Sequence, residues 1–174
     1  MAANWYISLA QLAERPGAVE LSQVAQQIGQ PVARPEILDA VLRGEETNLW
    51  PADQVDVALV ATNRIGDAVA EAQTLIDGYL QKRGYTLPLT DIKPILTSWA
   101  RAIVRYKLHA HRISDERTDP IVRDYRDALR FLREVADGAF SLGLGDTQKP
   151  AGGPPQITTP GRTFSMDSLR DYGK

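Results

Sequence analysis

The chain has 174 residues, of which 43% are hydrophobic and 24% are charged, as in an ordinary soluble globular protein of about one domain. It contains no cysteine, which excludes disulfides, iron–sulfur clusters and thiolate zinc sites. Its net charge of −2 favours neither nucleic acid nor an anionic membrane, and no apolar run approaches the roughly 18–20 residues of a membrane span.

Three short helices are predicted in the first part of the chain. Ser8 can cap a helix over residues 9–14, which a Pro-Gly pair then stops. A second helix is predicted over residues 19–28, and a third over residues 35–43 with a proline suited to its first turn. We interpret residues 30–52, which include that third helix, as an insertion or excursion rather than core.

Three longer helices are predicted to form the body of the protein, over residues 52–83, 94–111 and 120–137. Their apolar side chains recur mostly at gaps of 4 and 3, the spacing of a helix that buries one stripe. The expected stripes are Ala61, Ile65, Ala68, Ala72, Leu75 and Tyr79; Ile95, Trp99, Ala102, Ile103 and Tyr106; and Ile121, Tyr125, Ala128, Leu132 and Val135. No alternating pattern of strand length occurs within residues 1–140, and short links force neighbouring helices to run back on one another. The sequence therefore predicts an all-α fold, an antiparallel helical bundle.

After the predicted helical domain, residues 1–142, the composition changes. Residues 143–163 are rich in glycine and proline and have almost nothing to bury, so they cannot offset the entropy of ordering themselves. This stretch is predicted to be a flexible linker. A Pro-Gly pair within residues 157–164 can form the turn of a hairpin if a partner surface supports it.

The last segment, residues 164–174, carries large side chains. Four fall within nine residues: Phe164, Met166, Leu169 and Tyr172. Aromatic residues and Met are common anchors of docking segments, and a tethered peptide acts at high effective concentration. We interpret the segment as a binding peptide on a flexible arm. The alternative is that it folds back onto its own bundle.

Few side chains offer chemistry for catalysis. His109 and His111 are the only histidines, and two residues apart on a helix they point about 200° away from each other, so they cannot share one ion. Asp67 and Glu71 have the helical spacing of solvated surface carboxylates, opposite the apolar stripe. No nucleophile, P-loop or dinucleotide motif occurs. We expect a non-enzyme, with no catalytic residue, no metal and no cofactor.

Positive charge is concentrated in one part of the sequence. The first hundred residues hold 7 Lys and Arg against 12 Asp and Glu, a net of −5, whereas residues 101–133 hold 9 against 5, a net of +4. Arg101 and Arg105 are one helical turn apart, which presents a row of cations to a neighbouring acidic surface. Arg126 and Arg130 repeat that spacing. The neighbour can be another copy of the chain, so these arginines are candidates for subunit contacts. Plain solvation is the equal alternative.

Four stretches of the sequence together form an ordered pattern. They are "AQTLIDGYL" with Ile76, Asp77, Tyr79 and Leu80, "YTLPL" with Tyr85, Leu87, Pro88 and Leu89, "RDALRFLREVADG" at the end of the bundle, and "FSMDSL" in the tail. In this order and spacing the pattern resembles the small head–tail connector proteins of Mu-like phages and prophages, over most of residues 55–172. Residues 30–52 depart from the shorter pattern of that family.

The resemblance implies a structural role at the neck of a phage virion made in the host bacterial cytoplasm. Subunits of this class form a ring, here of about twelve copies, beneath the portal protein. The ring extends the channel for double-stranded DNA, which passes without sequence-specific binding, and offers a surface to a tail-side connector or tail terminator protein. A C-terminal arm in this class reaches into the portal, where Phe164, Met166, Leu169 and Tyr172 would dock. No membrane contact is implied.

The ring suggests roles for the charged residues. Asp67 and Glu71 can face the channel, because a negative lumen repels phosphate. The arginines at 101, 105, 126 and 130 can contact the portal instead of another subunit. The alternative function is a small helical DNA-binding or DNA-packaging factor, which requires an exposed basic face and salt-dependent retention of DNA.

Overall fold

The computed structural model describes residues 5–26, 29–113 and 115–144. Every regular element within these ranges is a helix, and no strand occurs in them, so the predicted all-α fold is confirmed. The elements are α1 (Leu9–Leu12), the π-helical turn η1 (Ala13–Gly17), α2 (Ala18–Val24), α3 (Pro35–Arg43), α4 (Ala52–Arg83), α5 (Pro94–His109) and α6 (Pro120–Asp137).

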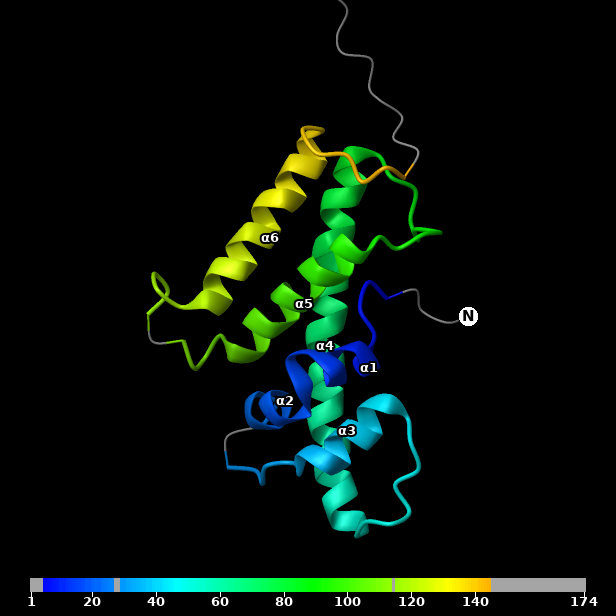
Figure 1. Cartoon of the computed structure of the whole chain (residues 1–174), viewed down its shortest axis with the longest axis vertical. Coiled ribbons are helices and arrows are strands. Elements are labelled where there is room, and N and C mark those ends of the chain that lie inside the picture. The colour runs from blue at the N-terminus through cyan, green and yellow to red at the C-terminus, as the bar shows by residue number, and fades with distance from the viewer. Residues whose placement is uncertain (1–4, 27–28, 114, 145–174) are drawn as a thin grey trace, which may run out of the picture. The chain divides into compact units, whose positions relative to one another are not determined.

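Helix α4 is the axis of the structure. Its 32 residues correspond to a length of about 48 Å at the α-helical rise. The short helix α3 lies beside the N-terminal half of α4, and α6 lies beside its C-terminal half (Figure 1). Helix α5 contacts both α4 and α6. The result is one bundle of three longer helices, with the N-terminal elements grouped around the other half of the axis.

The helices begin and end where local sequence signals place them. The Ser8 side chain accepts a hydrogen bond from the Gln11 backbone, and the Gln11 side chain accepts one from the Ser8 backbone, a capping box. Asp119 caps α6 through the backbone N–H of Ile121. Gly84 ends α4 at a φ of 98°, in the left-handed region where a side chain would be strained.

A continuous apolar core joins both halves of the structure. The predicted stripe of α4 is confirmed from Ala61 to Ala72, after which burial shifts by one position to Ile76 and Leu80, both 0% exposed. The aromatic rings of Trp99 and Phe131 stack with their centroids 5.9 Å apart. These contacts hold α5 and α6 against the axis, and α4 connects them to the N-terminal helices.

The predicted stripe of α5 is wrong in part. Ile95, assigned to the core, is 37% exposed, while its neighbour Leu96 is 0% exposed. Ala100 and Val104 are also buried, although the predicted stripe omits them. The physical reason is that α5 contacts two helices and therefore buries two adjacent faces, so one narrow stripe could not describe it.

The N-terminal region differs from its prediction in three ways. Helix α1 ends at Leu12, two residues before the predicted end, and η1 follows it directly. Helix α2 ends at Val24, four residues before the predicted end, and residues 27 and 28 are not described. The interpretation of residues 30–52 as an excursion outside the core is wrong for α3, because Ile37 and Leu38 are 0% exposed and lie in the main core. The segments on either side of α3 are mostly exposed, with Val32 50% and Leu49 90% exposed. Whether the stretch is an insertion relative to the family stays a prediction.

A polar contact fastens the start of the chain to α4. The Tyr6 hydroxyl, in a side chain only 3% exposed, donates a hydrogen bond of 2.5 Å to Asp77 Oδ1. The Gln73 side chain accepts a bond from the Tyr6 backbone N–H and donates one to Asp77 Oδ2. Burial, and then Asp77, raise the pKa of the Tyr6 hydroxyl. Sequence reasoning missed this link, which spans about 70 residues.

Candidate contact surfaces

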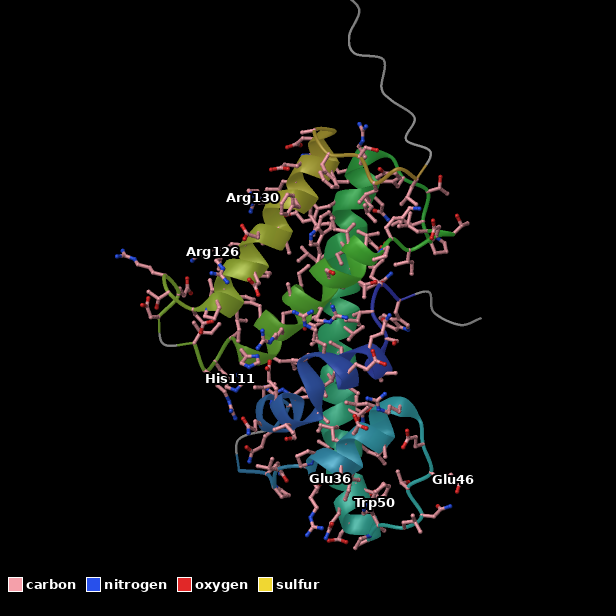
Figure 2. The ribbon with its side chains drawn as sticks, viewed as in Figure 1. Glu36, Glu46, Trp50, His111, Arg126 and Arg130 are labelled. Atoms are coloured by element: carbon pink, nitrogen blue, oxygen red, sulfur yellow. The ribbon has the colours of Figure 1, made fainter. Side chains whose placement is uncertain are left out.

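The four candidate arginines lie in two different places. Arg101 and Arg105 extend from α5 into a cleft of about 350 Å³. The residues that line this cleft are Arg15, Pro16, Glu20, Ser98, Arg101, Ala102, Arg105 and Asp124. Arg126 and Arg130 instead lie on the exposed outer side of α6 (Figure 2). The cleft brings together residues of η1, α2, α5 and α6, which no local sequence signal connects.

Arg105 links two helices within the cleft. Its Nε and Nη2 atoms donate to the two carboxylate oxygens of Glu20, at 2.5 Å and 2.8 Å. His109 lies on the same carboxylate, with Nε2 3.5 Å from Glu20 Oε1, and its Nδ1 is 2.8 Å from the Arg105 carbonyl oxygen. The bidentate bond to Glu20 raises the pKa of Arg105. Arg105 therefore joins α5 to α2.

Arg101 has a different environment. Its Nε donates to the backbone carbonyl oxygen of Arg15 at 3.0 Å, and no described carboxylate lies within 4.0 Å of its guanidinium. Burial and the charge of Arg15 lower the pKa of Arg101, and Glu14 opposes that effect. Arg15 also has no described carboxylate partner within that distance. The cleft thus holds two guanidinium groups that form no ion pair with a described carboxylate.

The two arginines on α6 are compensated locally. Arg126 Nη2 lies 3.1 Å from Glu116 Oε2, and Arg130 Nη2 lies 3.2 Å from Asp127 Oδ1. The guanidinium of Arg130 also lies over the ring of Phe131, 5.1 Å from its centroid. Such exposed pairs each contribute about 0–1 kcal/mol, so partners can exchange at little cost.

The two candidate channel residues are exposed on α4, one turn apart. Glu71 Oε2 lies 2.5 Å from Lys107 Nζ, so much of its negative charge is paired. Asp67 has no described cation within 4.0 Å. Their position does not identify the surface that would line a channel, and their role stays a prediction.

The candidate histidines also separate in the structure. His109 is the last residue of α5 and is held by Glu20 and a backbone carbonyl, whereas His111 lies beyond the helix end and is exposed (Figure 2). No group of three His, Asp or Glu side chains with metal-binding geometry occurs among the described residues.

A strongly acidic surface lies at the end of the structure where α4 begins, and the sequence interpretation did not separate it from the rest of the acidic half. We call it the acidic end. Its exposed carboxylates are Glu36, Glu45, Glu46, Asp53 and Asp56. Figure 2 shows Glu36, Glu46 and Trp50 gathered there. None of the five has a described cation within 4.0 Å, since the nearby Arg43 contacts Asp39 and Glu14 instead. Leu49, 90% exposed, lies in the loop between α3 and α4 together with Glu45 and Glu46.

Comparison with known proteins adds the decisive observation. The family described as Bacteriophage Mu, Gp36 matches residues 6–158, which is most of the chain. The chain belongs to this family. The resemblance to proteins of Mu-like phages is thereby confirmed, while the role at the head–tail junction stays a prediction.

Two curated relatives support the family assignment. The "Mu-like prophage FluMu protein gp36" of Haemophilus influenzae is 40% identical over 83 residues, which cover 48% of this chain and 55% of the relative. "Gene product J" of Escherichia phage Mu is 34% identical over 77 residues, 44% of this chain and 51% of the relative. The chain thus spans about half the length of the curated relatives it matches.

The remaining predicted site lies outside the described residues. It comprises the predicted linker over 143–163, of which only residues 143 and 144 are described, the possible hairpin over 157–164 and the docking segment over 164–174. The four arm residues Phe164, Met166, Leu169 and Tyr172 lie in that segment. Residues up to 144 form one compact unit. None of the helices within the described ranges has the length and apolar character needed to cross a bilayer.

Proposed function

We propose that the protein is a non-enzymatic structural component of the virion, a subunit of the head–tail connector ring beneath the portal. The observation that carries this proposal is the family match over residues 6–158, with relatives in phage Mu and in a Mu-like prophage. The all-α unit with surface charges of both signs suits a subunit that meets several protein partners in an assembly.

In this proposal the two parts of the chain have different roles. The helical unit forms the ring and the surface for a tail-side connector or terminator protein. The C-terminal arm docks on the portal through Phe164, Met166, Leu169 and Tyr172. About 20 residues separate Leu144 from Phe164, and as a flexible coil they span roughly 25 Å, with a fully extended limit near 66 Å. That reach is sufficient for a neighbouring protein in a ring.

The test is binding to purified portal rings from the phage that encodes this chain. Full-length protein should be retained, and a full-length variant with alanine at all four arm positions should be lost. A matched control replaces Ser165, Asp167, Ser168 and Asp171 of the same segment by alanine and should still bind. Equal retention of the first variant would show that the helical unit docks instead. Failure of the unmodified chain to bind would overturn the connector role.

One observation keeps the alternative of a DNA-binding or packaging factor in view. The outer side of α6 exposes Arg123, Arg126, Arg130 and Arg133. Aspartates on the same helix reduce its field, and sequence-independent DNA binding depends on phosphate neutralisation. An electrophoretic shift at low salt that Arg130→Glu abolishes would favour this alternative over the connector.

A further inference from the structure

The cleft on α5 holds two guanidinium groups that form no ion pair with a described carboxylate. Arg105 and Glu20 form an ion pair, and Asp124, which also lines the cleft, has its Oδ1 atom 3.6 Å from Arg123 Nη2. Arg15 and Arg101 remain, with no described carboxylate within 4.0 Å of either guanidinium, although the charge of Glu14 also acts on Arg101. Arg101 is partly buried, whereas Arg15 is exposed. A partly buried cation is stabilised by a hydrogen-bonded anion, because the surrounding dielectric constant is below that of water. The cleft is therefore prepared for a carboxylate or another anion.

The chain itself carries a matching surface. The loop between α3 and α4, residues 44–51, exposes the carboxylates of Glu45 and Glu46 with no described cation within 4.0 Å. Beside them Leu49 is 90% exposed, so the loop combines anionic groups with an apolar side chain that a partner can cover. An exposed Leu flanked by unpaired carboxylates has no evident role in the isolated subunit.

We propose that the cleft of Arg15 and Arg101 receives the loop of residues 44–51 from a second copy of the chain, with Glu45 or Glu46 bound by the two guanidinium groups. This inference rests on the proposed connector ring and specifies the surfaces that join its subunits. Because cleft and loop are different surfaces, the contact is heterologous, and repetition closes into a ring where the rotation permits.

Two features of the cleft favour a protein carboxylate over nucleic acid. Glu20 and Asp124 line the same cleft, and they repel a phosphate backbone that approaches with several charges at once. A single side-chain carboxylate enters between them with less repulsion. The Nε atom of Arg101 already donates to the Arg15 carbonyl, which fixes the orientation of the guanidinium. Its two Nη groups remain for bidentate binding of a carboxylate.

Site-specific disulfide formation tests the contact directly, because the natural chain has no cysteine. Ser98→Cys places a thiol in the cleft, and Asn48→Cys places one on the exposed loop without removing Glu45 or Glu46. The two full-length variants, with tags of different size, are mixed at high concentration and oxidised. The control mixes Ser98→Cys with Gln81→Cys, an exposed position on α4 away from the loop. We expect about tenfold more mixed dimer from the first mixture than from the control.

Charge reversal identifies the groups that make the contact. Arg101→Glu in the cleft variant should lower the yield of mixed dimer about tenfold, as should Glu45→Arg in the loop variant, and the two together should restore it. Arg117→Glu, a reversal at an exposed position in the loop before α6, should leave the yield unchanged. If Arg101→Glu fails to fold by circular dichroism, Glu45→Arg alone decides, because that side chain is exposed.

The outcomes separate this inference from the connector role. A yield no higher than the control, or one that charge reversal leaves unchanged, overturns the inference. So does retention of DNA that Arg101→Glu abolishes without any mixed dimer, which would assign the cleft to phosphate. Portal binding through the arm without the mixed dimer would refute this inference and leave the connector role standing. Formation of the mixed dimer without portal binding would refute the connector role and leave this inference standing.

Discussion

Replacing Leu38 by alanine should lower the free energy of unfolding by about 2–5 kcal/mol, the usual cost of removing a fully buried leucine side chain. Leu38 is 0% exposed and lies on α3 within the main core. A loss of this size is a large fraction of the roughly 5–15 kcal/mol that stabilises a domain. The matched control is Leu49→Ala in the following loop, where the side chain is 90% exposed and the change should stay within about 0.5 kcal/mol.

Urea unfolding followed by the helical circular dichroism signal measures both variants. The midpoint should fall markedly for Leu38→Ala and stay near that of the unmodified chain for Leu49→Ala, with similar slopes. If the Leu38 variant also changed by less than about 0.5 kcal/mol, α3 would not be part of the core, and the interpretation of residues 30–52 as an excursion would be reinstated.

Two further predictions concern the bond between Tyr6 and Asp77 and two glycines. Burial and Asp77 raise the pKa of the Tyr6 hydroxyl in the folded state. The hydroxyl therefore contributes its full stabilisation below the unfolded pKa of about 10, and this stabilisation is lost as the pH rises from there toward the folded pKa. Tyr6→Phe should therefore cost about 1.5–3 kcal/mol at pH 8 and much less at pH 11, and an equal cost at both values would contradict this. Gly78 lies within α4, and a Cβ added there would meet no atom within 4 Å beyond those of its neighbours in the helix. Gly78→Ala should therefore raise the free energy of unfolding by about 0.5–1 kcal/mol. Gly138→Ala should lower stability by about 1 kcal/mol or more, because φ is +83° and the new Cβ would lie 2.7 Å from Arg83 Nη1. Thermal melts in which both glycine variants shift in the same direction would refute that contrast.

The helices of the bundle could be predicted because their signals are local. Glycine after the last turn ends both α4 and α6, and proline in the first turn begins α6. The bounds of both helices agree with the predicted residue ranges. The burial of α3 could not be predicted in the same way. A helix of 9 residues has too few turns to distinguish a buried face from a surface one by spacing alone.

The candidate surfaces were predicted less completely, because their contacts join distant residues. The spacing of Arg101 and Arg105 indicated a row of cations, but their different partners, a backbone carbonyl of residue 15 and the carboxylate of Glu20, lie about 85 residues away. No local pattern records such pairs. The same is true of Tyr6 and Asp77, although Asp77 belongs to the stretch that carried the family resemblance.

The most direct test of the connector role is electron microscopy of particles from the phage that encodes this chain after its coding sequence is deleted. The account predicts DNA-filled heads and separate tails, with joined virions restored by the full-length chain but not by the variant with alanine at the four arm positions. Joined, infectious particles in the absence of the chain would contradict it.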